Sequence, residues 1–381
     1  MSEGKQGPLA GIRVLDFTTL LPGPMATLML AEAGAEVVKI EHPDGEAMRR
    51  YPPAWGRDSV MFAMLNRGKK SVTADLKDTS VRDRVLAIAR TADVVVEQFR
   101  PGVMDRLGLG YEAMRVVNPK LIYCAITGYG QSGPRSLRAG HDLNYIGDAG
   151  LLALSSGAPG RRSLPPALIA DIAGGSYPAV MNILLALRRR DTTGEGCFID
   201  VSMTENVLPF AYWAIGAGLG AGEWPADGAE RLTGGSPRYR LYETRDGRLA
   251  AVAALEQKFW DSFTAAIGLE PEYIDDARDP QKTIARVADI MAAKTAAEWQ
   301  PVFDRADCCA SIVQDIRAAL DDPHFKAREL FAPKLGNEKG ATLPAVPVPI
   351  ERALRPGAES DASAPALGAH NAEFGLKRVT N

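Results

Sequence analysis

Two residues in this sequence combine a side chain suited to proton transfer with a position where chemistry is common. His141 follows a glycine-punctuated segment at 127–134, and the pKa of histidine suits proton exchange near neutral pH. Asp171 stands three residues before a pair of glycines at the start of an expected helix, where a ligand can approach the backbone and an anion is stabilised. Each residue also has an ordinary structural interpretation, as the residue that begins a helix.

Further charged residues lie beside expected strands. Glu256 falls between an expected strand and an expected helix, where a carboxylate can begin the helix or act in a site. Basic residues gather at 66–71 and at 100–106, and each of these segments alone is typical of a solvated turn. Together at one end of a sheet, the two basic segments could hold the phosphates of a nucleotide-like group.

Several well-known catalytic and metal-binding patterns are missing from the sequence. It has no Gly-x-Ser-x-Gly elbow, no His-Glu-x-x-His helix and no phosphate loop of the Gly-x-x-x-x-Gly-Lys type. The cysteines have neither metal-ligand spacing nor the pattern of a disulfide framework; they are Cys124, Cys197, Cys308 and Cys309. We therefore expect a protein without a metal site.

The elements that must position these residues alternate between strand and helix. Short β-branched runs predict strands at 12–17, 36–40, 93–99 and 121–126. Between them, helices are predicted at 24–33 and 79–91. This alternation predicts an α/β fold with a Rossmann-like parallel sheet covered by helices. The first strand-to-helix turn, 17–24, lacks the spaced glycines of dinucleotide-binding proteins, so we expect neither a nicotinamide nor a flavin cofactor.

The chain divides by composition into four parts. A large domain is predicted at 1–208, ending with a long helix at 171–190 and a strand at 197–202. A Gly- and Ala-rich linker is expected at 209–235. A smaller α+β domain follows at 236–330, with a strand at 248–254 and then several helices. The Pro- and Ala-rich remainder, 331–381, is predicted to be an extended C-terminal arm that returns to the large domain.

Composition limits the partners and the location that we expect. The 381 residues carry a net charge of −3, with 46% hydrophobic and 24% charged residues, which is ordinary for a globular protein. A strongly basic surface for nucleic acid is excluded. No run of about 18 apolar residues predicts a membrane span, and residues 1–7 lack the apolar core of a secretory signal. We expect a cytoplasmic protein that binds neither nucleic acid nor membrane.

Nearly the whole chain resembles the family III CoA-transferases, the group that includes carnitine CoA-transferase and formyl-CoA transferase. Within that family it looks most like the α-methylacyl-CoA racemase branch. The segments that carry the resemblance are shared by the whole family, so they indicate the fold and the use of CoA and not the reaction. They are 8–16, 34–41, 65–71, 99–103 and 118–123.

The resemblance assigns catalytic roles to three residues. Asp171 is expected in both branches: as an acid and base in racemases, and in transferases as a nucleophile that forms a mixed anhydride. The segment 139–145 looks like the racemase pattern, with His141 as the second proton carrier and Glu256 orienting it. The stretch 253–259 contains no glycines, whereas transferases tend to have a glycine-rich loop there. The expected function is therefore an α-methylacyl-CoA racemase, with a CoA-transferase or a non-catalytic acyl-CoA-binding relative as alternatives.

The resemblance also implies a substrate, its contacts and an assembly. The substrate is an acyl-CoA thioester, so CoA belongs to the substrate and no separate cofactor is needed. The large domain would bind CoA, and its expected contacts with CoA or the acyl group are Arg67, Phe99, Arg100, Arg106, Tyr129 and Asp142. Family members are interlocked homodimers in which each chain forms a ring, and the expected linker and C-terminal arm would close that ring.

Overall fold

The computed structural model describes residues 6–155, 163–356 and 362–377. The chain forms two compact units, which we describe separately. The first unit contains 1–149, 167–209 and 324–381, and the second contains 150–166 and 210–323. The first unit thus includes the described part of the predicted arm, 331–356 and 362–377, and also 324–330, which we expected in the small domain.

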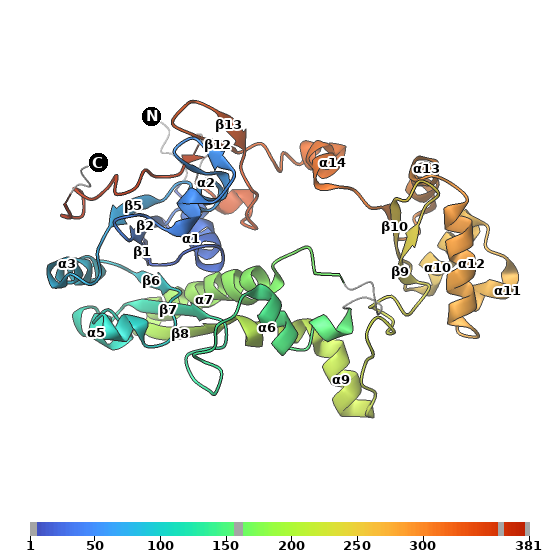
Figure 1. Cartoon of the computed structure of the whole chain (residues 1–381), viewed down its shortest axis with the longest axis horizontal. Coiled ribbons are helices and arrows are strands. Elements are labelled where there is room, and N and C mark those ends of the chain that lie inside the picture. The colour runs from blue at the N-terminus through green and yellow to red at the C-terminus, as the bar shows by residue number, and fades with distance from the viewer. Residues whose placement is uncertain (1–5, 156–162, 357–361, 378–381) are drawn as a thin grey trace. The chain divides into compact units, whose positions relative to one another are not determined.

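A six-stranded parallel sheet forms the centre of the first unit (Figure 1). Its strands, in spatial order, are β5 (Lys70–Thr73), β2 (Glu36–Glu41), β1 (Arg13–Asp16), β6 (Val94–Glu97), β7 (Ile122–Thr127) and β8 (Cys197–Ser202). All neighbouring pairs are parallel. This is the doubly wound Rossmann order, and it reverses direction between β1 and β6. Ligands in such sheets bind beyond the carboxyl ends of the strands at that reversal.

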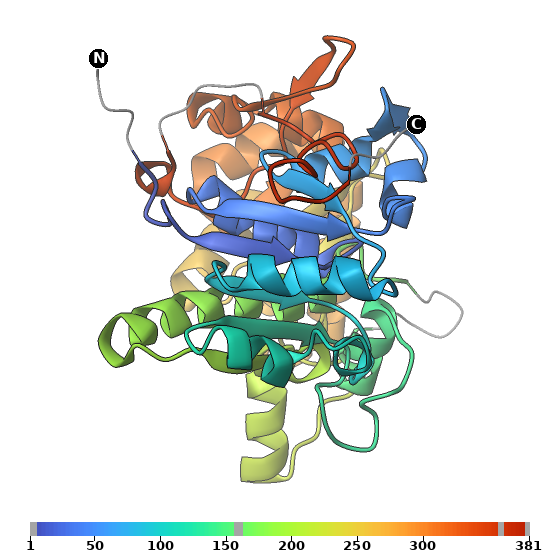
Figure 2. The same cartoon turned by 90° about the vertical axis from the view of Figure 1, so that its left-hand side faces the viewer.

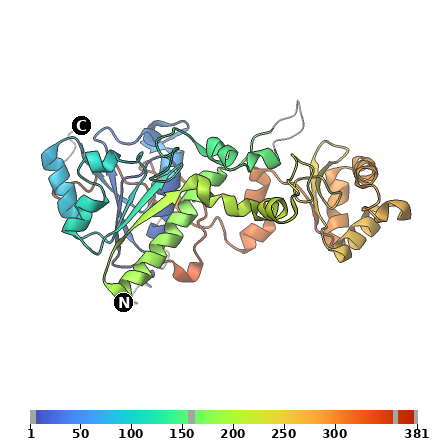
Figure 3. The same ribbon diagram turned by 90° about the horizontal axis from the view of Figure 1, so that it is seen from below.

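Helices cover both faces of this sheet, as the alternating sequence predicts. Figure 3 shows α1 (Pro22–Glu32) and α7 (Tyr177–Thr193) on one face, and Figure 2 shows α3 (Thr79–Ala89) and α5 (Tyr111–Val117) on the other. The strands between these layers are almost completely buried, because both of their faces contact helices. On the side of α3 and α5, the core includes Leu15, Val38, Val95 and Tyr123.

Shorter elements complete the first unit. The helical ones are η1 (Ala47–Arg50), α2 (Val60–Asn66), α4 (Val103–Arg106), α6 (Asp142–Asp148), η3 (Ala170–Ser176), α8 (Met203–Asn206), α15 (Pro323–Ala327) and η5 (Arg352–Leu354). A small hairpin joins β3 (Ala54–Trp55) to β4 (Asp58–Ser59). The predicted extended arm contains a second small sheet of β12 (Lys334–Gly336), β13 (Thr342–Pro344) and β14 (Ala362–Ser363).

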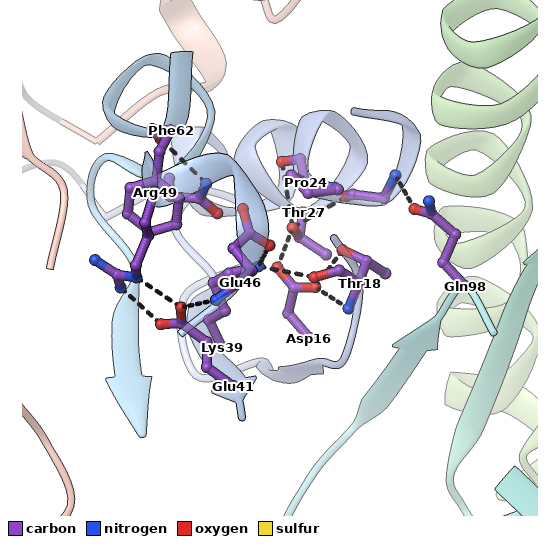
Figure 4. A network of polar contacts seen from close by, with 12 residues as sticks. Asp16, Thr18, Pro24, Thr27, Lys39, Glu41, Glu46, Arg49, Phe62 and Gln98 are labelled. Carbon is purple, nitrogen blue, oxygen red and sulfur yellow. Dashed lines mark hydrogen bonds and ion pairs between the residues drawn. The ribbon is translucent and has the colours of Figure 1, made fainter. Parts of the chain in front are cut away.

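A buried polar network fixes the loop that follows β1 (Figure 4). Asp16 is fully buried and accepts hydrogen bonds from Thr18 N (2.9 Å), Thr27 Oγ1 (2.6 Å) and Lys69 Nζ (3.1 Å). Burial alone would raise the pKa of Asp16, but the ammonium groups of Lys69 and Lys39 hold that pKa well below its usual range. Since every charge here has a partner, the network holds β1 and α1 in one arrangement beside the sheet reversal.

The second unit is built on a three-stranded antiparallel sheet. Its spatial order is β11 (Ala310–Ile312), β10 (Leu249–Ala253) and β9 (Tyr239–Glu243). Against it lie the helices α10 (Gln257–Ile267), α12 (Pro280–Ala292) and α13 (Ala296–Ala306), with Trp260, Phe263 and Trp299 buried between them. The shorter helices are η2 (Leu152–Leu154), α11 (Pro271–Ile274) and α14 (Ile316–Asp321).

The segment 209–235, which we predicted to be a linker, contains regular structure. Residues Leu208–Ala211 form η4 and Tyr212–Ala221 form the helix α9. Glycine disfavours a helix by about 1 kcal/mol relative to alanine, which is why the Gly-rich composition indicates a linker. Alanine, leucine and isoleucine between these glycines provide enough helix propensity for α9 to form.

One continuous helical run, Ala170–Thr193, is long and apolar enough to cross a membrane by length and composition alone. It includes η3 and α7, and 44% of its most apolar window is buried inside the protein. A helix that packs on a central sheet passes the same test, so this single run is weak support for a membrane span.

Candidate active site

The loop after β7 ends at His141 and is held by an aromatic ring. A Cβ atom on Gly128 or Gly140 would lie 2.4 Å or 2.7 Å from Cε1 of Tyr145, so both positions require glycine. The Tyr145 hydroxyl donates a hydrogen bond to the carbonyl of Gly140. The ring of Tyr129 meets that of Tyr145 edge to face, with the centroids 5.3 Å apart. Tyr145 therefore fixes the two ends of the loop that leads to His141.

His141 begins the helix α6 through its backbone. Its carbonyl accepts hydrogen bonds from the N–H groups of Asn144 (2.8 Å) and Tyr145 (3.2 Å), and its own N–H donates to Asn144 Oδ1 (3.1 Å). The structural interpretation of His141 as a helix-starting residue is thus correct. Because the residue is solvent-exposed, a helix-starting backbone and a reactive imidazole are compatible at this position.

Asp171 lies inside a π-helical turn and does not cap a helix. The turn η3 begins at Ala170, one residue earlier, so the interpretation of Asp171 as an N-cap is wrong. Its N–H donates to Oδ1 of Asp142 at 3.0 Å, and Asp142 is buried at the first position of α6. π-Helical turns are rare and occur often at functional sites. The hydrogen bond between these residues joins η3 to the helix that His141 begins.

Electrostatics couple Asp171 to its two neighbours. The pKa of Asp171 is raised to about 6: burial contributes most, the negative charge of Asp142 adds to the rise, and His141 opposes it. The geometric link is the hydrogen bond from the Asp171 N–H to Asp142, the residue that directly follows His141 in the chain. All three residues lie in the first unit. Near neutral pH, Asp171 can either hold or release a proton.

The two glycines after Asp171 make room for protein and not for a ligand. A Cβ atom on Gly174 would lie 2.5 Å from the carbonyl oxygen of Met203, and one on Gly175 would lie 3.1 Å from the Met203 side chain. Ser176 Oγ donates to the carbonyl of Pro22 at 2.7 Å. These glycines therefore allow α8 and α1 to pack closely against η3. Our expectation that they make room for a ligand is wrong.

Glu256 belongs to the second unit, where it precedes α10. Its carbonyl accepts the N–H groups of Phe259 and Trp260, both at 3.0 Å, but its side chain makes no capping hydrogen bond. By contrast, Ser59 and Asp279 at comparable helix starts both use their side chains as caps. Glu256 is exposed, and no hydrogen bond or ion pair engages its carboxylate within the described ranges. Its carboxylate is therefore available for a role outside its own helix.

Comparisons with known proteins support the expected family. The model of CoA-transferase family III matches residues 9–371. The α-methylacyl-CoA racemase of Mus musculus is 36% identical over 371 residues, or 96% of this chain and 92% of the relative. The acetyl-CoA:oxalate CoA-transferase of Acetobacter aceti is 32% identical over 360 residues, or 91% and 90%. The crystal structure of Rv3272 from Mycobacterium tuberculosis matches with a TM-score of 0.81 at 30% identity, covering 97% and 99%.

The chain belongs to CoA-transferase family III. The racemase and the transferase match over similar lengths and at similar identity, so membership of the family is compatible with both reactions. The fold of the first unit, with its six parallel strands, is the expected Rossmann-like sheet. In the described residues of this family III protein, no group of three or more His, Cys, Asp or Glu side chains is placed to hold a metal ion.

The basic residues expected to contact CoA fall into two groups. Arg100 and Arg106 follow β6 at the sheet reversal, are exposed, and have no ion pair with any residue that the structure describes. Arg67 is buried, and its guanidinium donates to Glu32 Oε1 and to two backbone carbonyls, at 2.6–2.9 Å. Lys69 belongs to the buried network of Asp16. Arg67 and Lys69 are therefore paired inside the protein, so the interpretation of 66–71 as a solvated turn is wrong at these two residues.

The other expected CoA contacts also have partners within the protein. Phe99 is half-buried and packs against the core under the sheet. The Tyr129 hydroxyl donates to Oδ2 of Asp148 at 2.7 Å. The buried carboxylate of Asp142 binds the Asp171 backbone. Contacts of these residues with CoA remain predictions, and each already has a role in shaping the site.

Tyr145 is the site residue that the sequence analysis did not single out. Its pKa is raised to about 12, mainly by burial, with Asp171 and Tyr129 adding to the rise and Arg100 opposing it. Its contacts with Tyr129 and Gly140 place it against the loop that leads to His141. Its spacing of four residues from His141, about one helical turn, was the only signal in the sequence.

Proposed function

We propose that this protein is an α-methylacyl-CoA racemase that inverts the α-carbon of 2-methylacyl-CoA thioesters. The observation that carries the proposal is the hydrogen bond that joins Asp171 to Asp142, directly after His141, together with the raised pKa of Asp171, about 6. Inversion by proton transfer needs two groups that exchange acid and base roles at the working pH. A histidine and a carboxyl group with a raised pKa form such a pair.

In one direction, neutral His141 accepts the α-proton of the thioester, and the electron pair moves into an enolate. Protonated Asp171 then donates a proton to the opposite face of the same carbon, and the thioester is restored. In the other direction, ionised Asp171 takes the proton and cationic His141 returns one. Both directions begin with one proton shared by the pair, so we expect activity to fall on either side of an optimum pH.

Glu256 would orient the imidazole of His141 and stabilise its cationic form, as the family resemblance implies. A carboxylate that hydrogen bonds to one ring nitrogen decides which nitrogen exchanges the substrate proton. The unused carboxylate of Glu256 supports this assignment. The α-proton of a thioester is only weakly acidic, so the enolate also needs stabilisation from polar groups.

CoA would bind beyond the carboxyl end of β6. The loop after β6 lies at the reversal of strand order, where ligands bind in doubly wound sheets. Arg100 and Arg106 present exposed guanidinium groups there, and such groups bind phosphate through paired hydrogen bonds. The positive charge of Arg100 lowers the pKa of Tyr145. This effect supports a CoA phosphate group bound at Arg100 on the same side of the unit as the proposed proton carriers.

Proton exchange in D2O tests the proposed reaction. One enantiomer of a 2-methylacyl-CoA is incubated with the protein, and the α-proton and the configuration are followed by NMR and chiral chromatography. The proposal predicts that deuterium enters the α-position and that optical purity is lost. If the α-proton stays while CoA moves to an added carboxylic acid, the racemase proposal is wrong.

A CoA-transferase is the second candidate, favoured by the 32% identity to the Acetobacter aceti transferase. In that reaction, ionised Asp171 attacks the thioester carbonyl, the C–S bond breaks, and CoA leaves as the thiolate. The CoA thiolate then attacks the aspartyl carbonyl of the mixed anhydride, which releases the donor acid as a carboxylate and leaves an aspartyl-CoA thioester. The acceptor carboxylate attacks this thioester and expels CoA, and the CoA thiolate attacks the acceptor carbonyl of the new anhydride, which forms the new acyl-CoA and frees Asp171. This route needs no histidine, so a His141→Ala variant would keep full transfer activity.

We also propose that the protein is a homodimer, as the family resemblance implies. The helix α7 contacts the sheet with one face, whereas its other face exposes a row of apolar side chains. These are Tyr177 (43% exposed), Met181 (56%), Leu184 (41%) and Leu185 (62%). A contiguous exposed apolar face is typical of a surface that another chain covers.

A further inference from the structure

The turn that carries Glu256 is not held by the Glu256 side chain. After β10 the chain passes through Leu255, Glu256 and Gln257 into the helix α10. Glu256 contributes only its carbonyl to the helix start, at 3.0 Å from the N–H groups of Phe259 and Trp260. The position of the backbone from which its carboxylate extends therefore depends on what holds the residues on either side.

Two arginines bind those flanking residues. Arg231 Nη2 donates to the carbonyl of Leu255 at 3.1 Å. Arg238 Nη2 donates to Gln257 Oε1 at 2.9 Å, and its Nη1 lies 3.5 Å from the same Leu255 carbonyl. The two guanidinium groups thus contact the turn immediately before and immediately after Glu256.

Arg238 is itself fixed from two other directions. Its Nε and Nη2 donate to both oxygens of Asp276, at 2.6–3.1 Å, and its guanidinium lies 5.0 Å from the centre of the Trp260 ring. Arg238 and Asp276 are both largely buried. Gln257 is held at its other end as well, because its Nε2 donates to Asp261 Oδ1 at 2.7 Å. The contacts form a rigid connection from the core of the second unit to the turn.

We propose that Arg238 and Arg231 are positioning residues that aim the Glu256 carboxylate; the inference rests on the role of Glu256 in the proposed function. An orienting carboxylate works only over a narrow range of distance and angle, because a small displacement of catalytic groups costs much of the rate. A planar guanidinium with several donors in a fixed geometry holds such a turn better than a flexible ammonium group.

The test compares Arg238→Met and Arg231→Met with a matched control, Arg286→Met. Arg286 also pairs with both oxygens of one carboxylate in the second unit, at 2.9 and 3.1 Å to Glu270, but it does not touch the turn. Racemisation kinetics and thermal unfolding are measured for each variant. We expect a fall in kcat of about tenfold for Arg238→Met and a smaller fall for Arg231→Met, with KM nearly unchanged. Arg286→Met should change only the unfolding temperature.

A second measurement separates positioning from a general loss of structure. Glu256→Gln is combined with Arg238→Met, and the double variant should be no slower than Glu256→Gln alone, because the arginine acts through the carboxylate. The inference is wrong if Arg238→Met lowers the rate of Glu256→Gln as much as it lowers the wild-type rate. It is also wrong if Arg238→Met keeps full activity while Glu256→Gln is impaired. Either result leaves the proposed function intact. Wild-type protein without any racemisation overturns both.

Discussion

At the scale of single residues, Asp142 both holds the backbone of Asp171 and raises the proton affinity of its carboxyl group. Its Oδ1 binds the Asp171 backbone at 3.0 Å, and its negative charge raises the pKa of the Asp171 carboxyl group. An Asp142→Asn variant keeps the acceptor oxygen and removes the charge. We predict that the pKa of Asp171 falls, and that the acidic side of the pH–rate profile moves to lower pH. If the acidic side of the pH–rate profile does not move, the charge of Asp142 does not raise the pKa of Asp171.

The raised pKa of Asp171 also predicts a stability effect. A folded-state pKa near 6, above the ordinary value of 3.8, means that the folded protein binds this proton more tightly than the unfolded chain. The stabilisation is complete below about pH 4 and is lost as the pH rises through 6. Asp171→Asn should therefore raise the free energy of unfolding at pH 8, on the order of 2 kcal/mol, and should have little effect at pH 4. Urea titrations at both pH values measure this, and equal effects at both would contradict it.

Residue types alone singled out the two proposed proton carriers but not their surroundings. His141 and Asp171 stand out in the sequence because few other side chains suit proton transfer. The hydrogen bond from Asp171 to Asp142 spans 29 positions and has no local signature. Lys69 looked like a phosphate ligand because the sequence does not show that it pairs with Asp16, 53 positions away. Charge in a sequence indicates a partner without saying whether that partner is a ligand or the protein itself.

At the scale of elements, the π-helical turn η3 depends on close packing against α8. A Cβ atom on Gly174 would lie 2.5 Å from the Met203 carbonyl oxygen, so Gly174→Ala must displace backbone. We predict a destabilisation of about 1–3 kcal/mol together with loss of activity, because the displaced turn carries Asp171. Thermal unfolding and racemisation assays measure the two effects.

Gly216→Ala is the matched control, since Gly216 lies in the helix α9 with no neighbour within 4 Å of an added Cβ. This change should leave activity intact and stabilise slightly, because alanine favours a helix over glycine by about 1 kcal/mol. If Gly174→Ala behaves like this control, the packing explanation of η3 is wrong.

The main elements were predictable because hydrophobic periodicity decides them. The expected strand at 197–202 is β8 with the same bounds. The expected strand at 36–40 ends one residue before β2 does, and the expected strand at 121–126 is shifted by one residue from β7. The sequence analysis missed β5, since Lys70 and Ser71 give a polar start to a strand that is nonetheless largely buried. It also expected one uniform helix from 171, because nothing in the local sequence distinguishes a π-helical turn from an α-helical one.

At the scale of the whole molecule, the apolar face of α7 predicts self-association. Light scattering should give about twice the chain mass of 40.8 kDa for the wild-type protein. Leu185→Glu places a charge on that face and should yield monomer or a marked loss of stability. Val116→Glu, which changes an 81%-exposed residue of α5 on the other side of the sheet, should remain dimeric. A wild-type monomer would contradict the proposed assembly.

The central claim is that His141 and Asp171 each exchange a proton with the same carbon. The most direct test follows α-deuterium incorporation into each separate enantiomer of a 2-methylacyl-CoA in D2O, using His141→Ala and Asp171→Asn variants. Both variants should lose racemisation, and each should lose exchange chiefly with the enantiomer whose proton its missing group removes. If His141→Ala still racemises at the wild-type rate, or if both variants exchange both enantiomers equally, the two-base account is wrong.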